Sequence, residues 1–202
     1  IQQADKIVAK MAREAVEGFK LSLAAVNSYD GAVAEKIRKI EDDTDHYEDI
    51  VGTYLAQVSR YQLSDEDGAI VSKLLKAIGD FERISDHSVN VLESVEELQE
   101  KKIEFSDKAK KEFGVLCAAL NEILDMTLVA YIDNDAQAAA KVEPLEQVVD
   151  ELRRILRDSH IVRLRSGECT VEAGFIWSDL LTNLERTSDH CSNVAVCVMD
   201  AK

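Results

Sequence analysis

Acidic side chains recur at one fixed spacing in this sequence, and that spacing could create a metal site. The pattern Glu-x-x-x-Asp occurs four times, at Glu41/Asp45, Glu82/Asp86, Glu146/Asp150 and Glu185/Asp189. Residues four apart lie on one face of an α-helix, so each pair would present two carboxylates one turn apart. Among 20 Glu and 19 Asp in 202 residues, a single pair could arise by chance on a solvated acidic face.

The four pairs are in register with an internal duplication. Residues 80–91 and 183–194 read DFERISDHSVNV and NLERTSDHCSNV, with seven of twelve positions identical at an offset of 103 residues. Residues 30–45 align with 135–150 at an offset of 105, where five of sixteen positions match. A fixed offset is the sign of a repeated structural unit, and the difference of two residues fits in a loop. Each half of the chain therefore carries two of the acidic pairs.

Turn signals divide the chain into six segments of helical length. Gly and Pro are few, aromatic residues make up only 5%, and apolar residues recur every three or four positions, all of which favours helices over strands. Ser64 and Ser106 are predicted N-caps, and Pro144 predicts a kink or a late start in the fifth helix. The expected helices span residues 3–28, 31–61, 65–100, 107–132, 135–165 and 169–200. We predict an all-α fold of two tandem three-helix bundles, residues 1–104 and 105–202.

The helices would bring the acidic pairs together. If the second and third helices of each bundle are neighbours, two pairs face each other and gather four carboxylates. Carboxylates on facing helices are how bundles bind iron, manganese, magnesium or calcium, and zinc is a further candidate. The alternative without metal is that Arg83 and Arg186 neutralise the acids as ion pairs.

Other polar residues flank the acidic pairs. His87 and His190 directly follow an Asp, which rotates them by about 100° around the helix, so we expect them to support the ligands or the packing rather than to bind metal. Asn90 and Asn193 extend the polar stripe and could hydrogen-bond the carboxylates or a neighbouring helix. His160, like His46, has no counterpart in the repeat and is expected at the surface.

Composition excludes several classes of partner. Lys+Arg 24 against Asp+Glu 39 gives a net charge of -15, which disfavours nucleic acid and anionic lipid surfaces and favours cations. The sequence lacks a run of 18 apolar residues and an opening signal peptide, so a membrane span is not expected. Four cysteines without a CxxC pair are expected to act as small apolar residues in a reducing, cytosolic compartment: Cys117, Cys169, Cys191 and Cys197.

Two copies of E-R-x-S-D-H-x-x-N, each preceded by E-x-x-x-D about forty residues upstream, resemble the PhoU family over nearly the whole chain. The segments ERISDHSVN and ERTSDHCSN resemble in particular the PhoU-like cytoplasmic domain that follows the membrane part of bacterial sodium/phosphate cotransporters. Free-standing PhoU proteins more often carry Gly where Ser85 and Ser188 stand. The start at Ile1 rather than Met agrees with a domain excised from a longer protein.

The resemblance implies a metal-binding regulator of phosphate uptake. Its E-x-x-x-D motifs would hold iron or other metal ions through the eight acids, supported by Arg83, His87, Asn90, Arg186, His190 and Asn193. The expected partner is the membrane domain of a phosphate transporter or a phosphate-signalling protein, and self-association is left open. The expected location is the cytoplasm, with a tether to the plasma membrane if a transmembrane domain lies upstream.

Three alternatives stand beside a cotransporter domain. The first is a free-standing PhoU-type regulator. The second is a carboxylate-bridged metalloenzyme, which loses ground because such bundles use Glu-x-x-His units and this chain has none. A Gly-rich phosphate loop and a G-x-S-x-G elbow are also missing, so we expect no enzyme. The third is a helical scaffold without metal.

Overall fold

The computed structural model describes residues 1–200 and consists of six long α-helices in that range. The prediction of an all-α fold with six helices is confirmed, and the predicted helix boundaries agree within a few residues. The helices are α1 (Gln2–Ala25), α2 (Gly31–Val58), α3 (Asp65–Lys101), α4 (Asp107–Ile132), α5 (Ala136–Arg165) and α6 (Val171–Asp200).

Side-chain caps fix where four of these helices begin. The carboxylate of Asp30 accepts hydrogen bonds from the first amides of α2, and Asp135, its counterpart in the repeat, does the same for α5. Ser64 and Ser106 cap α3 and α4 as predicted, by accepting from the amides of Asp67 and Ala109. Each cap satisfies amides that have no partner inside the helix, and the Asp30/Asp135 pair of the repeat sets equivalent starts for α2 and α5.

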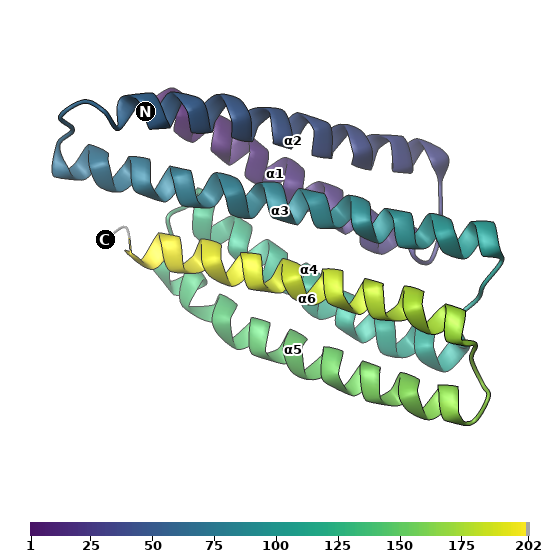
Figure 1. Cartoon of the computed structure of the whole chain (residues 1–202). Helices are drawn as coiled ribbons and strands as arrows, with labels where there is room; N and C mark the ends of the chain where they lie inside the picture. The colour runs from purple at the N-terminus through teal and green to yellow at the C-terminus, as the bar shows by residue number, and fades with distance from the viewer. Residues whose placement is uncertain (201–202) are drawn as a thin grey trace.

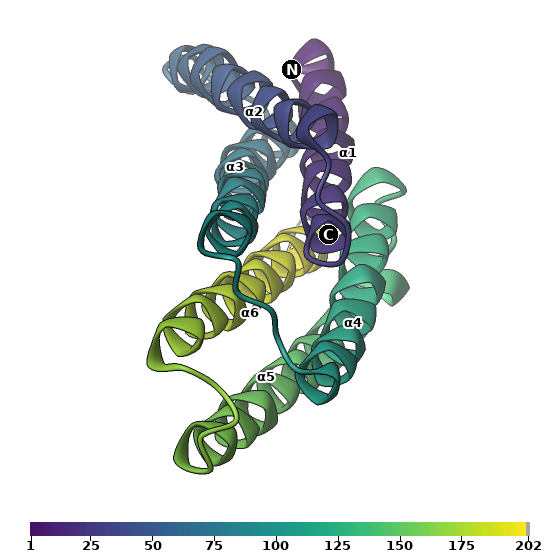
Figure 2. The ribbon, with the colours of Figure 1, turned by 90° about the vertical axis from the view of Figure 1, so that its right-hand side faces the viewer.

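The helices form two three-helix layers with a shared core. Figure 1 shows α1, α2 and α3 above α4, α5 and α6, and Figure 2 shows the two layers end-on. The two halves meet where α3 packs on α6 and α1 packs on α4. Outer helices α2 and α5 contact only helices of their own half. One continuous cluster of buried apolar side chains draws on all six helices.

Helices α5 and α4 each bear on an expectation from the sequence. Helix α5 begins at Ala136 and continues through Pro144, so a late start at the proline is wrong. Helix α4 is the one helix within residues 1–200 that is long and apolar enough to cross a membrane, judged by length and composition. Buried core helices pass the same test, and α4 contributes Leu116, Leu120 and Ile123 to the core between the two layers.

The segment between α3 and α4 joins the two halves. It runs from Lys102 to Ser106, and the predicted division between residues 104 and 105 falls inside it. Lys102 adopts a left-handed conformation, with φ 54°, where α3 ends. Because one apolar core continues across both halves, the two bundles pack as one body, and their division into separate domains stays a prediction.

Candidate metal centre

The first acidic cluster lies between α2 and α3. Asp45 and Glu48 on α2 and Glu82 on α3 each place a carboxylate oxygen within 4.8 Å of the other two. Glu41 and Asp86 lie close enough to act electrostatically on the cluster. Four of these five acids are those that the sequence predicts for this half. Glu48 is additional, and its place one helical turn after Asp45 could have identified it.

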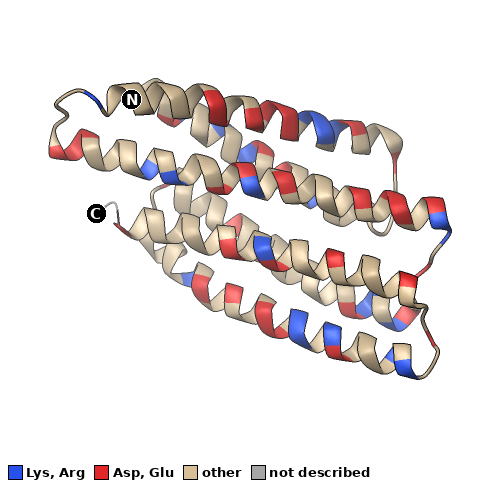
Figure 3. Cartoon of the chain, viewed as in Figure 1, with Lys and Arg blue, Asp and Glu red and all other residues tan. Residues whose placement is uncertain are grey.

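The second acidic cluster repeats this arrangement between α5 and α6. Carboxylate oxygens of Glu146, Asp150 and Asp189 lie within 4.8 Å of one another. Glu185, the fourth predicted acid of this half, is one turn before Asp189 and interacts electrostatically with Asp150. All eight predicted acids are therefore gathered into two groups of neighbouring side chains. Figure 3 shows acidic positions along α2, α3, α6 and α5, the four helices on the side turned to the viewer.

In both clusters the pKa values of some acids are raised, which indicates that a cation would be favourable there. Burial, together with the charge of Asp86, raises the pKa of Glu82 to about 7. Burial and the charge of Asp150 do the same for Glu146, whose pKa also rises to about 7. The pKa of Glu41 is raised in the same way. Carboxyl groups that share a confined site cannot all ionise without cost, and a cation among them removes that cost.

Arginine side chains neutralise these acids only in part. Arg83 lies 3.1 Å from Asp86 and 3.4 Å from Glu82, but its side chain is 59% exposed. Ion pairs that face water this freely contribute little stability. Arg186, its counterpart, is exposed, and within residues 1–200 it makes no ion pair closer than 4.0 Å. The metal-free interpretation with two arginine pairs therefore applies at most to the first half.

The two clusters differ at one position of the repeat. Glu48 of α2 aligns with Arg153 of α5 at the offset of 105 residues. The Arg153 guanidinium lies 3.4 Å from Glu185 and opposes the rise in the pKa of that carboxyl group, a rise that burial causes. At this position the first cluster has an acid where the second has a cation.

The histidines and asparagines that follow the acids lie elsewhere. His87 and His190 are at the contact between α3 and α6, where His190 hydrogen-bonds Asp80 and His87 hydrogen-bonds Asn183. Asn193 also donates to Asp80, at 3.1 Å. The expectation that these residues support the packing describes their contacts better than a role beside metal ligands. Asn90 is exposed on α3, and its backbone carbonyl accepts a hydrogen bond from Ser94 Oγ.

The donor atoms fit a hard metal ion. Each cluster offers only carboxylate oxygens, which suit magnesium, calcium, manganese and iron, whereas zinc prefers nitrogen and sulfur ligands. Asp45 and Asp150 are exposed, so a hydrated ion could reach each cluster from solvent. The geometry could accommodate two separate cations, each between an outer helix and a central helix.

Comparison with known proteins gives one consistent result. The PhoU domain family matches residues 8–95 and 116–198, one match in each half. A relative from Thermotoga maritima, described as "Phosphate-specific transport system accessory protein PhoU homolog 1", is 24% identical over 93% of this chain and 80% of its own length. A PhoU homolog from Deinococcus radiodurans is 23% identical over 79% of this chain and 74% of its own length.

Two solved structures have the same fold. The crystal structure of PhoU from Pseudomonas aeruginosa matches with a TM-score of 0.79 and 20% identity, over 99% of this chain and 92% of that one. The phosphate transport system regulatory protein PhoU from Streptococcus pneumoniae matches with a TM-score of 0.85 and 17% identity, over 99% and 93%. At these identities the likeness establishes the arrangement of helices.

Proposed function

The chain belongs to the PhoU family, and on this premise we propose that it regulates phosphate transport as an accessory protein whose two acidic clusters bind metal ions. The observation that supports the metal-binding part is the convergence of carboxylates from two helices in each half. The transport part rests on the relatives, which are described as accessory or regulatory proteins of phosphate transport. Such descriptions agree with the expectation that the chain is not an enzyme.

The proteins compared above favour an accessory regulator over a cotransporter domain. Each is described as a PhoU protein or homolog, and none of them as a cotransporter. Ser85 and Ser188, the departures from Gly that suggested a cotransporter, are both fully buried, so the small size of serine suits the packing of the core. Small size is a packing requirement that a free-standing regulator also has. The cotransporter domain is therefore our second candidate.

The proposed mechanism links the metal ions to partner binding. A cation in each cluster would neutralise the carboxylates of Glu82 and Glu146 and hold α2 against α3 and α5 against α6. These four helices lie on one side of the molecule, which makes that side the proposed surface for contact, in the cytoplasm, with the membrane domain of a phosphate transporter or with a phosphate-signalling protein (Figure 3). Loss of the cations would restore repulsion and loosen the surface. Self-association stays a prediction, and the same surface could form the contact between two copies of the chain.

The experiment combines metal content with phosphate uptake. Protein purified without chelator is analysed for metal, and the double variant Glu82→Gln/Glu146→Gln is compared with wild type. A strain that lacks the protein is then complemented with each form, and phosphate uptake is measured. We expect bound metal and restored control of uptake with wild type, and loss of both with the double variant. Full control of uptake by a variant without metal would refute the metal part and keep the regulatory part.

A further inference from the structure

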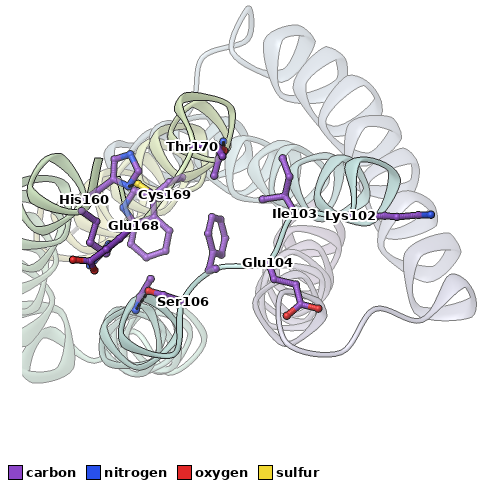
Figure 4. Close-up of a pocket in the computed structure, with 13 residues that line it drawn as sticks. Lys102, Ile103, Glu104, Ser106, His160, Glu168, Cys169 and Thr170 are labelled. Atoms are coloured by element: carbon purple, nitrogen blue, oxygen red, sulfur yellow. Dashed lines mark hydrogen bonds between the residues drawn. The ribbon is translucent and has the colours of Figure 1, made fainter. Parts of the chain in front are cut away.

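A cavity of about 280 Å³ lies at the end of the molecule where the α3–α4 connection passes the end of α5 and the start of α6. Its walls include Phe105 and Ser106 from the connection, His160 and Arg163 from α5, and Thr170 and Trp177 from the start of α6 (Figure 4). None of these residues belongs to an acidic cluster. The volume admits several molecules the size of water, and hence a small polyatomic ion.

Two buried nitrogen donors of the cavity wall have no hydrogen-bond partner within residues 1–200. Arg163 is 3% exposed, and its Nη1 donates to Glu112 at 2.6 Å while its Nη2 has no hydrogen-bond acceptor. Trp177 is 1% exposed, and its indole Nε1 also lacks an acceptor. The guanidinium carbon lies 5.5 Å from the centre of the Trp177 ring, so the two donors are neighbours. Buried donors are normally satisfied, so these two together indicate an acceptor that binds in the cavity.

Two helix N-termini add partial positive charge at the cavity wall. Helices α4 and α6 both begin at its wall, next to Ser106 and Thr170, and a helix N-terminus carries a partial positive charge. Lys102 and Glu104 line the rim, and Figure 4 shows both side chains extending away from the other labelled residues. Glu168 also lines the wall, and its carboxylate accepts a hydrogen bond from Ser166 Oγ, so the positive character of the cavity comes from the two helix N-termini and the free donors rather than from its net charge.

The charge state of His160 also depends on its place in the cavity wall. Burial lowers the pKa of His160 below its ordinary value, and the charge of Arg163 lowers it further. The imidazole stacks near Trp177 with ring centroids 6.3 Å apart, and its Nδ1 lies 3.7 Å from the sulfur of Cys169. This residue is half-buried, so the expectation of a surface histidine is wrong. Burial, the larger of the two causes, disfavours any charge, whereas the contribution of Arg163 would favour an anion beside it.

We propose that this cavity binds a small oxyanion, with inorganic phosphate as its simplest member. The oxyanion oxygens accept from Nη2 of Arg163 and from the indole of Trp177, and the N-termini of α4 and α6 stabilise the charge. Aromatic walls from Phe105 and Trp177 exclude water and strengthen these interactions. The site is separate from the acidic clusters, so failure of either proposal leaves the other standing.

The single tryptophan makes the proposal directly measurable. Trp177 is the only Trp of the chain, so its indole gives one N–H signal in a ¹⁵N–¹H spectrum. We expect sodium phosphate and sodium sulfate to move that signal saturably, and sodium chloride at equal ionic strength to leave it in place. An unmoved signal with both oxyanions, as for a cavity that holds only water, would overturn the proposal.

Two further measurements make the test specific. Arg163→Lys keeps the charge and loses the planar fork, so phosphate affinity should fall about tenfold or more. Arg165→Lys, an exposed change two residues away, should leave it unaltered. If Arg163→Lys does not fold, alkylation of Cys169 in the wild type replaces it, because phosphate in the cavity should slow that reaction at least threefold. Equal affinity in both lysine variants, or unprotected Cys169, would contradict the site.

Discussion

His87 of α3 and His190 of α6 face each other across the contact between the two halves, with ring centroids 5.6 Å apart. His190 donates from Nδ1 to Asp80 at 2.9 Å, and His87 donates from Nδ1 to Asn183 at 3.0 Å. Asp80 lies seven positions before His87, and Asn183 lies seven positions before His190. Asp80 and Asn183 are themselves equivalent in the repeat. The motif thus has two faces: its acids turn to the outer helix, and its histidines join the halves.

The histidine contact between the two halves predicts that Asp80→Leu lowers the stability of the protein. Leucine keeps the size and removes the acceptor that serves both His190 and Asn193, so two donors lose their partner. We expect the free energy of unfolding to fall by about 1–3 kcal/mol, measured by urea denaturation. Asp80→Asn restores an acceptor and copies Asn183, so it should cost clearly less. Equal losses for the two variants would show that the hydrogen bonds at this joint do not contribute.

The acidic clusters predict an unusual dependence of stability on pH. The pKa of Glu82 and of Glu146 is about 7 in the folded protein, above the ordinary value of 4.5, so the folded state holds more protons between these limits. Stability from these groups is complete below pH 4.5 and is lost as the pH rises through 7. With chelator present, we expect the melting temperature to fall between pH 5 and pH 8, and a divalent cation to restore it at pH 8.

A matched variant isolates this effect. Burial lowers the pKa of His87 below 6.5, so His87 acts in the opposite direction and loses stability as the pH falls. The double variant Glu82→Gln/Glu146→Gln keeps His87 and removes the two acids. Its melting temperature should decline less between pH 5 and pH 8 than that of wild type. A wild-type curve that is no steeper than the variant's would contradict the assigned cause.

The fold and the acidic clusters could be predicted from the sequence because both follow from periodicity. A helix places Glu41 and Asp45 on one face, and the duplication repeats the geometry. The histidine joint was not predicted in detail, because a rotation of 100° gives the direction of His87 but not which helix lies there. Glu48 was not predicted as a site residue, because its counterpart in the repeat is Arg153. The cavity at Trp177 depends on a connecting segment, which carries no periodic signal.

The exchange of Glu48 for Arg153 between the halves predicts unequal metal affinities. The first cluster has an extra carboxylate, whereas in the second Arg153 lies 3.4 Å from Glu185 and already supplies a positive charge. Calorimetric titration with Mn²⁺ should therefore resolve a tighter and a weaker site. Glu48→Arg should weaken the tighter site at least tenfold, and Arg153→Glu should strengthen the weaker one by a similar factor.

The variants Glu48→Arg and Arg153→Glu serve as controls for each other. Each variant should leave the affinity of the other half unchanged, since α2 and α5 contact only helices of their own half. The double variant Glu48→Arg/Arg153→Glu should exchange the order of the two sites and restore a tight and a weak site. Two equal sites in the wild type, or a double variant without any tight site, would show that these positions do not set the affinity.

Two glycines of similar helical context predict opposite effects of substitution by alanine. A Cβ at Gly174 of α6 would lie 2.6 Å from Nε2 of His160, which must then move from its place near Trp177. A Cβ at the exposed Gly114 of α4 would meet no atom within 4 Å.

Gly114→Ala should therefore stabilise the protein by about 0.5–1 kcal/mol, because alanine restricts the unfolded chain and favours the helix. Gly174→Ala should destabilise it by about 1–3 kcal/mol through overpacking. Urea denaturation with Trp177 fluorescence measures both, and a gain of stability for Gly174→Ala would mean that the His160 ring yields freely.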